Sequence, residues 1–301
     1  MKHLLITLVF VLTAVSEAHA GIRILACEPE WAALSEELAG DKATIHSATT
    51  GLQDPHRITA RPSLIAKMRQ ADLVICSGAD LEAGWLPLLL RKSGNPKVQP
   101  GRPGYIEAAS HVRMREIPRN IDRSEGDVHS QGNPHIHTDP RNIARLAPVI
   151  SARLASIDQE HAAYYRQQLA DFKQRWDRAI SRWEAEAKNL KGLPVVTQHK
   201  SWVYLIEWLG LERLAVLEEK PGIPPGAGHL AGIARQLEQK PAKVILRAAY
   251  QSPRASEWLS ERSGIPAAAL PFTVGGNENA RDLLGLFDET LRILNQYAHA
   301  Q

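Results

Sequence analysis

The sequence predicts an α/β protein in which two parallel-sheet lobes are joined by one long helix and enclose a cleft. Three observations support this prediction. Short apolar runs alternate with helical patterns early in the chain, the same alternation returns near its end, and a long amphipathic stretch separates the two. Alternating strands and helices are typical of parallel sheets with crossover helices. At 301 residues, two domains are expected.

The first alternation covers residues 22 to 76. The expected elements there are a strand at 22–27, a helix at 30–39, a strand at 43–48, a helix at 61–70 and a strand at 71–76. Prolines and glycines between residues 96 and 104 mark a loop, after which a short strand is expected at 105–108. The segment 113–138 is polar and irregular, so we interpret it as a mobile loop.

The middle of the chain contains no proline or glycine from Asp158 to Leu190. Large apolar residues recur there at steps of three and four, namely Tyr165, Leu169, Phe172, Trp176, Ile180 and Trp183. This spacing predicts one amphipathic helix with Asp158 as its N-cap. Its ~33 residues would extend about 50 Å, which favours a helix that spans both lobes. A coiled-coil dimer is the competing interpretation, but the aromatic stripe favours packing on a globular body, so we expect a monomer.

The alternation resumes after Gly192. The expected strands are 195–197, 214–217, 244–248 and 267–272, and the expected helices are 201–210, 229–239, 252–263 and 280–297. We therefore divide the chain into a signal peptide (1–20), an N-terminal α/β lobe (21–157), a connecting helix (158–191) and a C-terminal α/β lobe (192–301). Ligands of open parallel sheets bind beyond the carboxyl ends of the strands, so the site is expected in the cleft.

Residues 1–20 have the pattern of a Sec signal peptide. Lys2 is followed by an apolar run at 4–15, and Ala18-His19-Ala20 is a small-x-small cleavage site. Twelve helical residues would cover only about 18 Å of a hydrocarbon core of roughly 30 Å, which disfavours a transmembrane anchor. Because no cysteine stands at the cleavage site, we expect no lipid anchor and a periplasmic location.

The charged residues and the cysteines narrow the possible functions. The formal net charge is +3 and the basic residues are spread along the sequence, so nucleic-acid binding gains no support. Cys27 and Cys76 each end an apolar run. They could form a disulfide, because adjacent parallel strands lie about 4.8 Å apart, within the bridging range. Two buried free thiols fit the sequence equally well.

Three of the twelve histidines stand in similar settings and are candidate metal ligands. His56 follows Pro55, His135 follows Pro134, and His199 comes directly after the expected strand 195–197. A preceding proline restricts the backbone and so helps to hold the imidazole at a defined angle. Neutral imidazole is the commonest protein ligand for zinc. Ligands from both lobes would place the metal between them.

Several segments extend this pattern over essentially the whole mature chain. They are Asp54-Pro55-His56, residues 71–78 with Leu81-Glu82 and Trp85-Leu86, Asn133-Pro134-His135 with Asp139-Pro140, the long helix, and Thr197-Gln198-His199 with Tyr204. Together they resemble the zinc/manganese solute-binding proteins of ABC transporters. The resemblance implies two lobes bridged by a rigid helix, with the metal bound between them by three histidines and a carboxylate. It also implies delivery to a permease subunit in the inner membrane, with loading by a metallochaperone left open.

In this comparison His56, His135 and His199 match the three histidine ligands, and the fourth ligand departs from the pattern. Where many family members have Asp-Pro after the last strand, residues 270–276 here are Leu-Pro-Phe-Thr-Val-Gly-Gly. Asp282 is the expected substitute, with Glu278 or water as alternatives, although either acid could instead serve a helix N-terminus. Fewer carboxylates favour Zn²⁺ over Mn²⁺, because manganese prefers oxygen ligands. The roles of His129 and His137, in the polar loop, stay open.

A secreted zinc-dependent hydrolase is the alternative function, because three histidines can leave a fourth zinc position open for water. The sequence contains no HExxH helix, no GxSxG turn and no glutamate beside a ligand histidine. We therefore predict a periplasmic zinc-binding protein that is not an enzyme.

Overall fold

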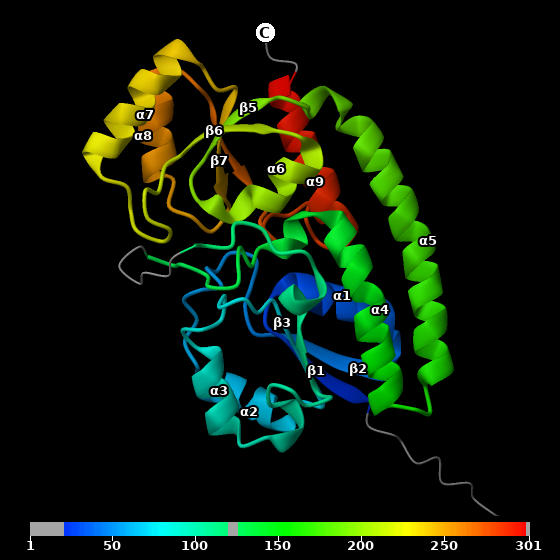
Figure 1. The fold of residues 1–301 in the computed structure, drawn as a ribbon. Coiled ribbons are helices and arrows are strands. Elements are labelled where there is room, and N and C mark those ends of the chain that lie inside the picture. The colour runs from blue at the N-terminus through cyan, green and yellow to red at the C-terminus, as the bar shows by residue number, and fades with distance from the viewer. Residues whose placement is uncertain (1–20, 120–125, 299–301) are drawn as a thin grey trace, which may run out of the picture.

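A computed structural model describes residues 21–119 and 126–298, and it contains two α/β lobes stacked beside one long helix (Figure 1). The N-terminal lobe has a parallel sheet in the order β2-β1-β3-β4, formed by β1 (Ile22–Ala26), β2 (Ala43–Ser47), β3 (Leu73–Cys76) and β4 (Tyr105–Glu107). The C-terminal lobe has a parallel sheet in the order β6-β5-β7-β8, formed by β5 (Pro194–Thr197), β6 (Glu212–Val216), β7 (Val244–Ala248) and β8 (Ala267–Leu270). The predicted fold class is confirmed.

The central strands are apolar because both of their faces are buried. In β1, Ile24 is paired with Ile45 on one side and with Leu73 on the other. Val195 and Val196 of β5 are likewise buried although they point to opposite faces. Continuous apolar runs of this kind are typical of parallel strands covered by helices on both sides.

The helices that cover the first sheet are α1 (Pro29–Ala39), α2 (Pro62–Gln70), α3 (Leu86–Ser93) and α4 (Pro140–Ile157). Those of the second lobe are α6 (Val203–Leu209), α7 (Ala227–Gln239), α8 (Arg254–Ser263) and α9 (Leu283–Ala298). The sequence analysis did not identify α3 or α4. Asp139 caps α4 by accepting a hydrogen bond from the backbone N–H of Arg141, and Pro148 lies inside the helix. An internal proline removes a backbone hydrogen bond and is unfavourable inside a helix, and no element was predicted for this segment.

The connecting helix α5 (Ala162–Glu186) runs along both lobes, as Figure 1 shows, and contacts α4, α1 and α9. It has 25 residues, about 37 Å at 1.5 Å per residue, and is thus shorter than the predicted helix. The chain turns at Asp158, which ends α4. The Asp158 carboxylate accepts hydrogen bonds from the side chains of Tyr165 and His161 and does not cap the backbone of α5. The predicted aromatic stripe is buried, with Phe172, Trp176 and Trp183 at 2% exposure or less.

The main hydrophobic core is continuous from one lobe to the other. It contains apolar residues of β1 and α1 together with the α5 stripe and residues of α6 and α9. Each lobe also has one smaller cluster of buried apolar residues, on the face of its sheet that points away from the main core. Because the two lobes share one core, side-chain packing fixes their relative position. Residues from both lobes can therefore form one site.

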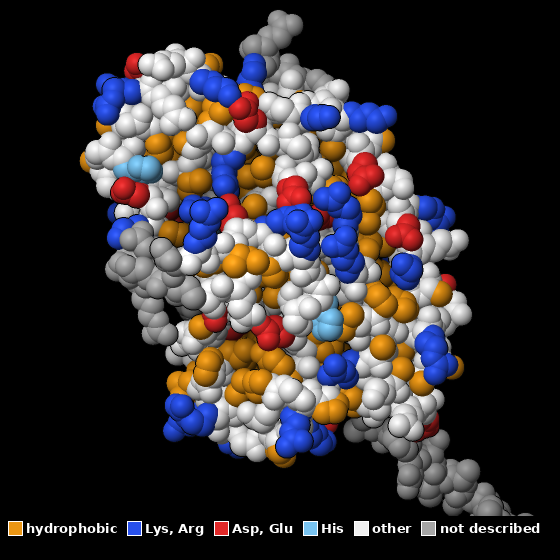
Figure 2. Space-filling model, in the orientation of Figure 1, with side chains coloured by type: hydrophobic (Ala, Val, Ile, Leu, Met, Phe, Trp, Pro, Cys, Tyr) orange, Lys and Arg blue, Asp and Glu red, His pale blue; other side chains and the backbone are white. Residues whose placement is uncertain are grey.

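The disulfide, membrane-spanning segments, the undescribed residues and the distribution of charge remain to be described. The disulfide between Cys27 and Cys76 is present, with a Cα–Cα distance of 4.8 Å across the adjacent strands β1 and β3. Within the described residues, no helix is both long and apolar enough to cross a bilayer. The predicted signal peptide at 1–20 lies outside the described residues, as does 120–125 of the polar loop. On the face in Figure 2, lysine and arginine side chains are distributed with acidic side chains between them.

Candidate metal centre

Four histidines from loops of both lobes converge in the cleft. His56 lies in the loop between β2 and α2, and His199 lies two residues after the end of β5. His129 and His135 belong to the segment between β4 and α4. The loop positions of His56 and His199 follow from the parallel sheets, whose ligand-binding loops leave the carboxyl ends of the strands.

The three predicted ligands form a compact triangle of imidazole rings. The ring centroid of His56 lies 5.3 Å from that of His135 and 6.0 Å from that of His199, and the centroids of His135 and His199 are 5.9 Å apart. With Zn–N bonds of about 2.0–2.1 Å, imidazole ligands of one tetrahedral ion have centroids roughly 5 Å apart. The sequence therefore identified three residues that the fold brings together at nearly the spacing of a zinc site.

His129 completes this group as a fourth imidazole. Its Nε2 lies 3.2 Å from Nε2 of His56, and its ring centroid is 6.1 Å from that of His135. One ring nitrogen from each of His56, His129 and His135 lies within 4.8 Å of the others. The four donors are thus contributed by three loops, one of which supplies two of them.

Carboxylates orient two of the four rings. Nδ1 of His56 is 2.8 Å from Oδ1 of Asp54, and Nδ1 of His199 is 2.6 Å from Oε2 of Glu218. Each contact occupies Nδ1 and leaves Nε2 available to a metal ion, as in carboxylate–histidine–metal triads. Burial would raise the pKa of Asp54, but the hydrogen bond and charge of His56 outweigh it and hold this pKa below its ordinary value.

His135 is held differently, by packing. It is 1% exposed, and its ring stands edge-on to Phe272 with centroids 5.2 Å apart. Neither of its ring nitrogens has a hydrogen-bond partner among the described residues, and the same is true of Nδ1 of His129. Burial, followed by the nearby imidazoles His56 and His199, lowers the pKa of His135 well below its ordinary value. A buried, neutral and unpaired imidazole is costly unless a cation binds it, so this residue fits a metal ligand.

Asp282 is not brought to this cluster, contrary to our expectation. Its carboxylate accepts a hydrogen bond from the backbone N–H of Gly285 (2.7 Å) and so caps the N-terminus of α9. It lines a separate surface hollow with Glu36 and Glu37 of α1. The alternative Glu278 is exposed on the same turn before α9. The physical reason is local, because the first turn of a helix offers unpaired N–H groups that an acidic side chain satisfies.

His137 is also not part of the cluster, although it lies two residues from His135. Its Nδ1 contacts Oε1 of Glu30 at 2.9 Å, and its Nε2 contacts the carbonyl oxygen of Phe272 at 3.0 Å. Thr273 donates to the other oxygen of Glu30. Burial would raise the pKa of Glu30, but His137 and Thr273 together hold it below its ordinary value. These contacts join α1 to the segment after β8, so His137 links the two lobes.

The sequence analysis missed His129 as a candidate ligand and Glu218 as a partner of His199. Glu218 follows a strand that was predicted at 214–217, beside the strand that leads to His199. An acidic residue at that edge of the sheet could therefore have been predicted to lie near His199. His129 stands in a polar segment without periodicity, where the sequence contains no information about its distance from the other histidines.

The cluster opens to solvent on two sides. One cavity of about 390 Å³ is lined by His56 and His199, and another of about 400 Å³ by His129, His135 and His199. The side chains of Asp54, Asp127 and Glu218 line the first cavity. Carboxylates in a concave surface raise the local concentration of cations, which suits a site that admits a metal ion.

We expect Glu218→Gln to weaken zinc binding by about 10–100-fold, the usual effect of losing a group that orients a ligand histidine. Glutamine keeps the size of the side chain but lacks the charge that supports a metal-bound imidazole. Isothermal titration with a competing chelator measures the change. The exposed Glu238→Gln on α7, away from the cluster, serves as the control, and equal affinities of the two variants would contradict a role for Glu218.

Comparisons with known proteins identify related sequences. The family described as "ZnuA: Zinc-uptake complex component A periplasmic" matches residues 24–297. The manganese ABC transporter substrate-binding lipoprotein PsaA of Streptococcus pneumoniae is 23% identical over 249 residues, which cover 80% of this chain and 76% of that protein. The iron ABC transporter substrate-binding lipoprotein MtsA of Streptococcus pyogenes serotype M1 is 23% identical over 262 residues, covering 84% and 80%.

The fold has close counterparts among solved structures. A crystal structure of ZnuA superimposes with a TM-score of 0.77 at 19% sequence identity, over 93% of this chain and 99% of that chain. At this identity the likeness concerns the backbone arrangement, and the choice of metal has to be argued from the side chains of this chain.

Proposed function

Because the chain belongs to the family of periplasmic zinc-uptake component A proteins, which includes metal-binding proteins of ABC transporters, we propose that it captures Zn²⁺ and delivers it to a membrane importer. In this proposal His56, His135 and His199 are three ligands and His129 is the fourth. The ion is cargo that the protein binds and releases.

The composition of the donor set carries this proposal. Four imidazoles surround the centre of the cluster, and the nearest carboxylates, Asp54 and Glu218, are engaged with Nδ1 atoms. Imidazole suits zinc, whereas manganese prefers carboxylate, carbonyl and water oxygens. Relatives named for manganese and iron are only 23% identical. Their metals therefore do not decide the metal of this chain.

The same donor set argues against the hydrolase alternative. A catalytic zinc keeps one coordination position for water, whereas four protein ligands close the tetrahedral shell. With His129 in the fourth position, no place remains for an activated water. We propose that the protein binds metal without catalysing a reaction.

The location and partners follow from this function. We propose that residues 1–20 direct export, that the mature protein works in the periplasm as a monomer, and that it docks on the permease subunit of an ABC importer. A metallochaperone that loads it is compatible with a site open on two sides.

The central test is a competition between metals. Apo protein dialysed against equimolar Zn²⁺ and Mn²⁺ is expected to retain one zinc per chain and to exclude manganese, as measured by elemental analysis. The control is the His135→Ala/His199→Ala double variant, which should retain neither ion. Retention of manganese in preference to zinc would refute the zinc assignment but leave the metal-binding role intact.

The pH dependence of zinc binding follows from the buried imidazoles. Burial first, and then the neighbouring His56 and His199, lowers the pKa of His129 to about 3 and that of His135 well below its ordinary value. Both rings therefore stay neutral from pH 7.5 to 5. When zinc is released in this range, we expect the ligand histidines together to take up at most two protons per ion from solution. Titration in buffers of different ionisation enthalpy measures this number. An uptake near four would contradict the lowered pKa values.

The stability of the apo protein gives a second measure of the same shifts. Above about pH 6.5 these histidines are neutral in both the folded and the unfolded chain. Between about pH 6.5 and 3 the unfolded chain binds a proton that folded His129 does not bind, and the lowered pKa of His135 acts in the same direction. The free energy of unfolding should therefore fall as the pH is lowered through this window. The His129→Gln variant should show a shallower fall.

A further inference from the structure

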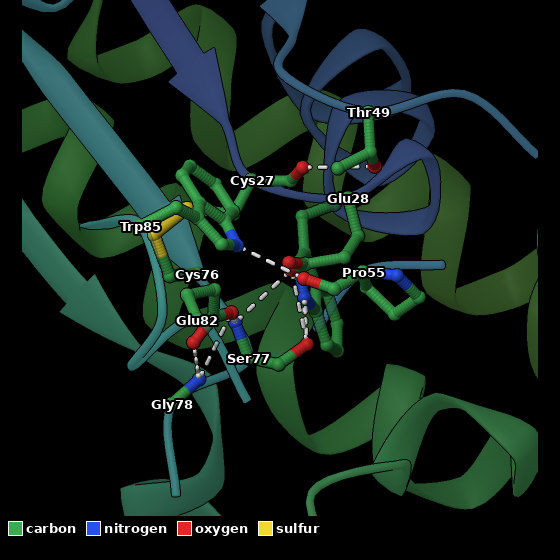
Figure 3. The surroundings of a disulfide bond; sticks show 10 residues. Cys27, Glu28, Thr49, Pro55, Cys76, Ser77, Gly78, Glu82 and Trp85 are labelled. Carbon is green, nitrogen blue, oxygen red and sulfur yellow. Dashed lines mark hydrogen bonds between the residues drawn. A yellow bond between two sulfur atoms is a disulfide. The ribbon is translucent and has the colours of Figure 1, made fainter. Parts of the chain in front are cut away.

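A second group of metal-binding side chains lies in the N-terminal lobe and takes no part in the histidine cluster. Cys27, Cys76 and Glu82 are all buried, and one ligand atom from each lies within 4.8 Å of the others. Figure 3 shows them around the disulfide, with the carboxylates of Glu28 and Glu82 both directed toward Ser77. The group thus combines two sulfurs and the Glu82 carboxylate after the carboxyl ends of β1 and β3, and the Glu28 carboxylate shares the contact with Ser77.

The two carboxylates are buried at a cost. Glu28 and Glu82 are each 2% exposed. Glu82 accepts hydrogen bonds from the backbone N–H groups of Ser77 (2.8 Å) and Gly78 (3.1 Å). Oε2 of Glu28 accepts from the hydroxyl of Ser77 at 3.1 Å, whereas its Oε1 has no partner among the described residues. Burial raises the pKa of Glu82 to about 7, and burial together with the charge of Glu82 raises the pKa of Glu28 well above its ordinary value.

Such an arrangement calls for a cation or a proton. A buried carboxylate oxygen without a donor is unfavourable, and two neighbouring carboxylates are more so. Nothing in the histidine cluster uses these residues. A cavity of about 10 Å³, lined by Glu28, Thr49 and Pro55 but not by the cysteines or Glu82, lies beside the group and has room for one water molecule.

We propose that reduction of the Cys27–Cys76 disulfide creates a second metal site, in which the two thiolates and the Glu82 carboxylate bind one Zn²⁺ and Oε1 of Glu28 supplies the fourth donor. Two sulfurs and two oxygens give the closed tetrahedral shell of a structural zinc site. The Cα atoms of the two cysteines are 4.8 Å apart. Separating the sulfurs from bonding distance to the spacing of two zinc ligands therefore requires only side-chain rotation and small shifts.

The chemistry balances with a dithiol reductant. The reductant gives two electrons and two protons, the S–S bond breaks, and Cys27 and Cys76 become thiols while the reductant becomes a disulfide. Zinc then displaces the two thiol protons and the proton that the Glu28 and Glu82 carboxyls hold between them, and all of these leave to solvent. The N–H groups of Ser77 and Gly78 already point at Glu82 and offset part of the added negative charge. Because thiolates bound to zinc are poor nucleophiles, the bound ion should also slow re-formation of the disulfide.

This site goes beyond the proposed function and can be tested without it. The test uses the full mature chain carrying His56→Ala and His199→Ala, so that the histidine cluster does not contribute to the metal count. We expect the oxidised protein to bind no zinc in equilibrium dialysis. After reduction with a phosphine that does not bind metal, it should bind one zinc per chain. With Co²⁺ as the probe, the reduced protein should show thiolate-to-cobalt charge-transfer absorption in the near ultraviolet.

Two further variants connect the signal to these residues. Glu82→Gln in the same background should weaken the zinc and remove its protection of the thiols against reoxidation, whereas Glu36→Gln on α1 should change neither. Cys27→Ala/Cys76→Ala should abolish the charge-transfer band. If the reduced chain unfolds without metal, adding zinc should restore its helical circular dichroism. Absence of the band, binding that survives loss of both cysteines, or failure of zinc to refold an unfolded reduced chain would each overturn the proposal.

Discussion

His135→Ala is expected to lower zinc affinity by about 1,000-fold or more, equivalent to roughly 4 kcal/mol of binding free energy. The effect should be large because His135 is the proposed ligand whose two ring nitrogens have no hydrogen-bond partner among the residues that the structure describes, so its neutral imidazole is available to the ion. Its ring is positioned by the contact with Phe272, and its backbone by hydrogen bonds with the side chains of Asn133 and Thr138. Competition with a fluorescent zinc chelator measures the loss.

The fold of this variant must be checked separately, because a buried side chain is removed. Without zinc, the variant should melt within a few degrees of the apo wild type. With zinc at a hundredfold excess over the wild-type dissociation constant, only the wild type should gain about 2.7 kcal/mol by mass action. If His135→Ala binds zinc as tightly as the wild type, the assignment of this ligand is wrong.

The fourth zinc ligand is Asp282 in the sequence-based expectation and His129 in the proposal made from the structure. His129→Ala should reduce zinc affinity and leave a position that water can fill, whereas Asp282→Ala should leave zinc affinity unchanged. Loss of the Asp282 cap should instead cost about 0.5–2 kcal/mol of stability. The opposite pattern would return the fourth position to Asp282. Because both residues lie in loops, the comparison separates coordination from folding.

Most of the fold could be predicted from the sequence because the strands are buried on both faces. The run from Leu73 to Cys76 has no polar residue, and this pattern in a short, β-branched run is typical of a strand covered by helices on both sides. Helix α4 could not be recognised, because Pro148 interrupts its pattern. The start of α5 was misplaced because an aspartate before a helix resembles an N-cap, whereas Asp158 binds side chains of the following turn.

The candidate site was only partly predictable, for a similar reason. His56 and His199 follow recognisable strands or prolines, so the parallel topology places them at the cleft. His129 depends on how a long polar segment folds back, for which the sequence contains no periodic signal. Asp282 was chosen by its nearness along the chain, and local helix capping outweighed that expectation.

Removing the disulfide should have the second large effect, this time on stability. The bond closes a loop of 49 residues, and Cys27→Ala/Cys76→Ala should lower the free energy of unfolding by about 4 kcal/mol through greater freedom of the unfolded chain. For a protein of this size the melting temperature should fall by roughly 8–16 °C. Thermal unfolding followed by circular dichroism measures it.

Zinc binding at the histidines should survive this change, because other contacts hold the His56 loop. Thr49 donates a hydrogen bond to the carbonyl of Cys27, and the indole of Trp85 donates to the carbonyl of Pro55; neither bond involves sulfur. Zinc at a hundredfold excess should therefore restore about 2.7 of the lost 4 kcal/mol in the Ala/Ala variant. A chemically reduced wild type should recover more than this variant, because it retains the thiols that the variant lacks. Equal recovery would show that zinc stabilises the reduced chain through the histidines alone, and a loss of zinc affinity in the variant would show that the disulfide also positions His56.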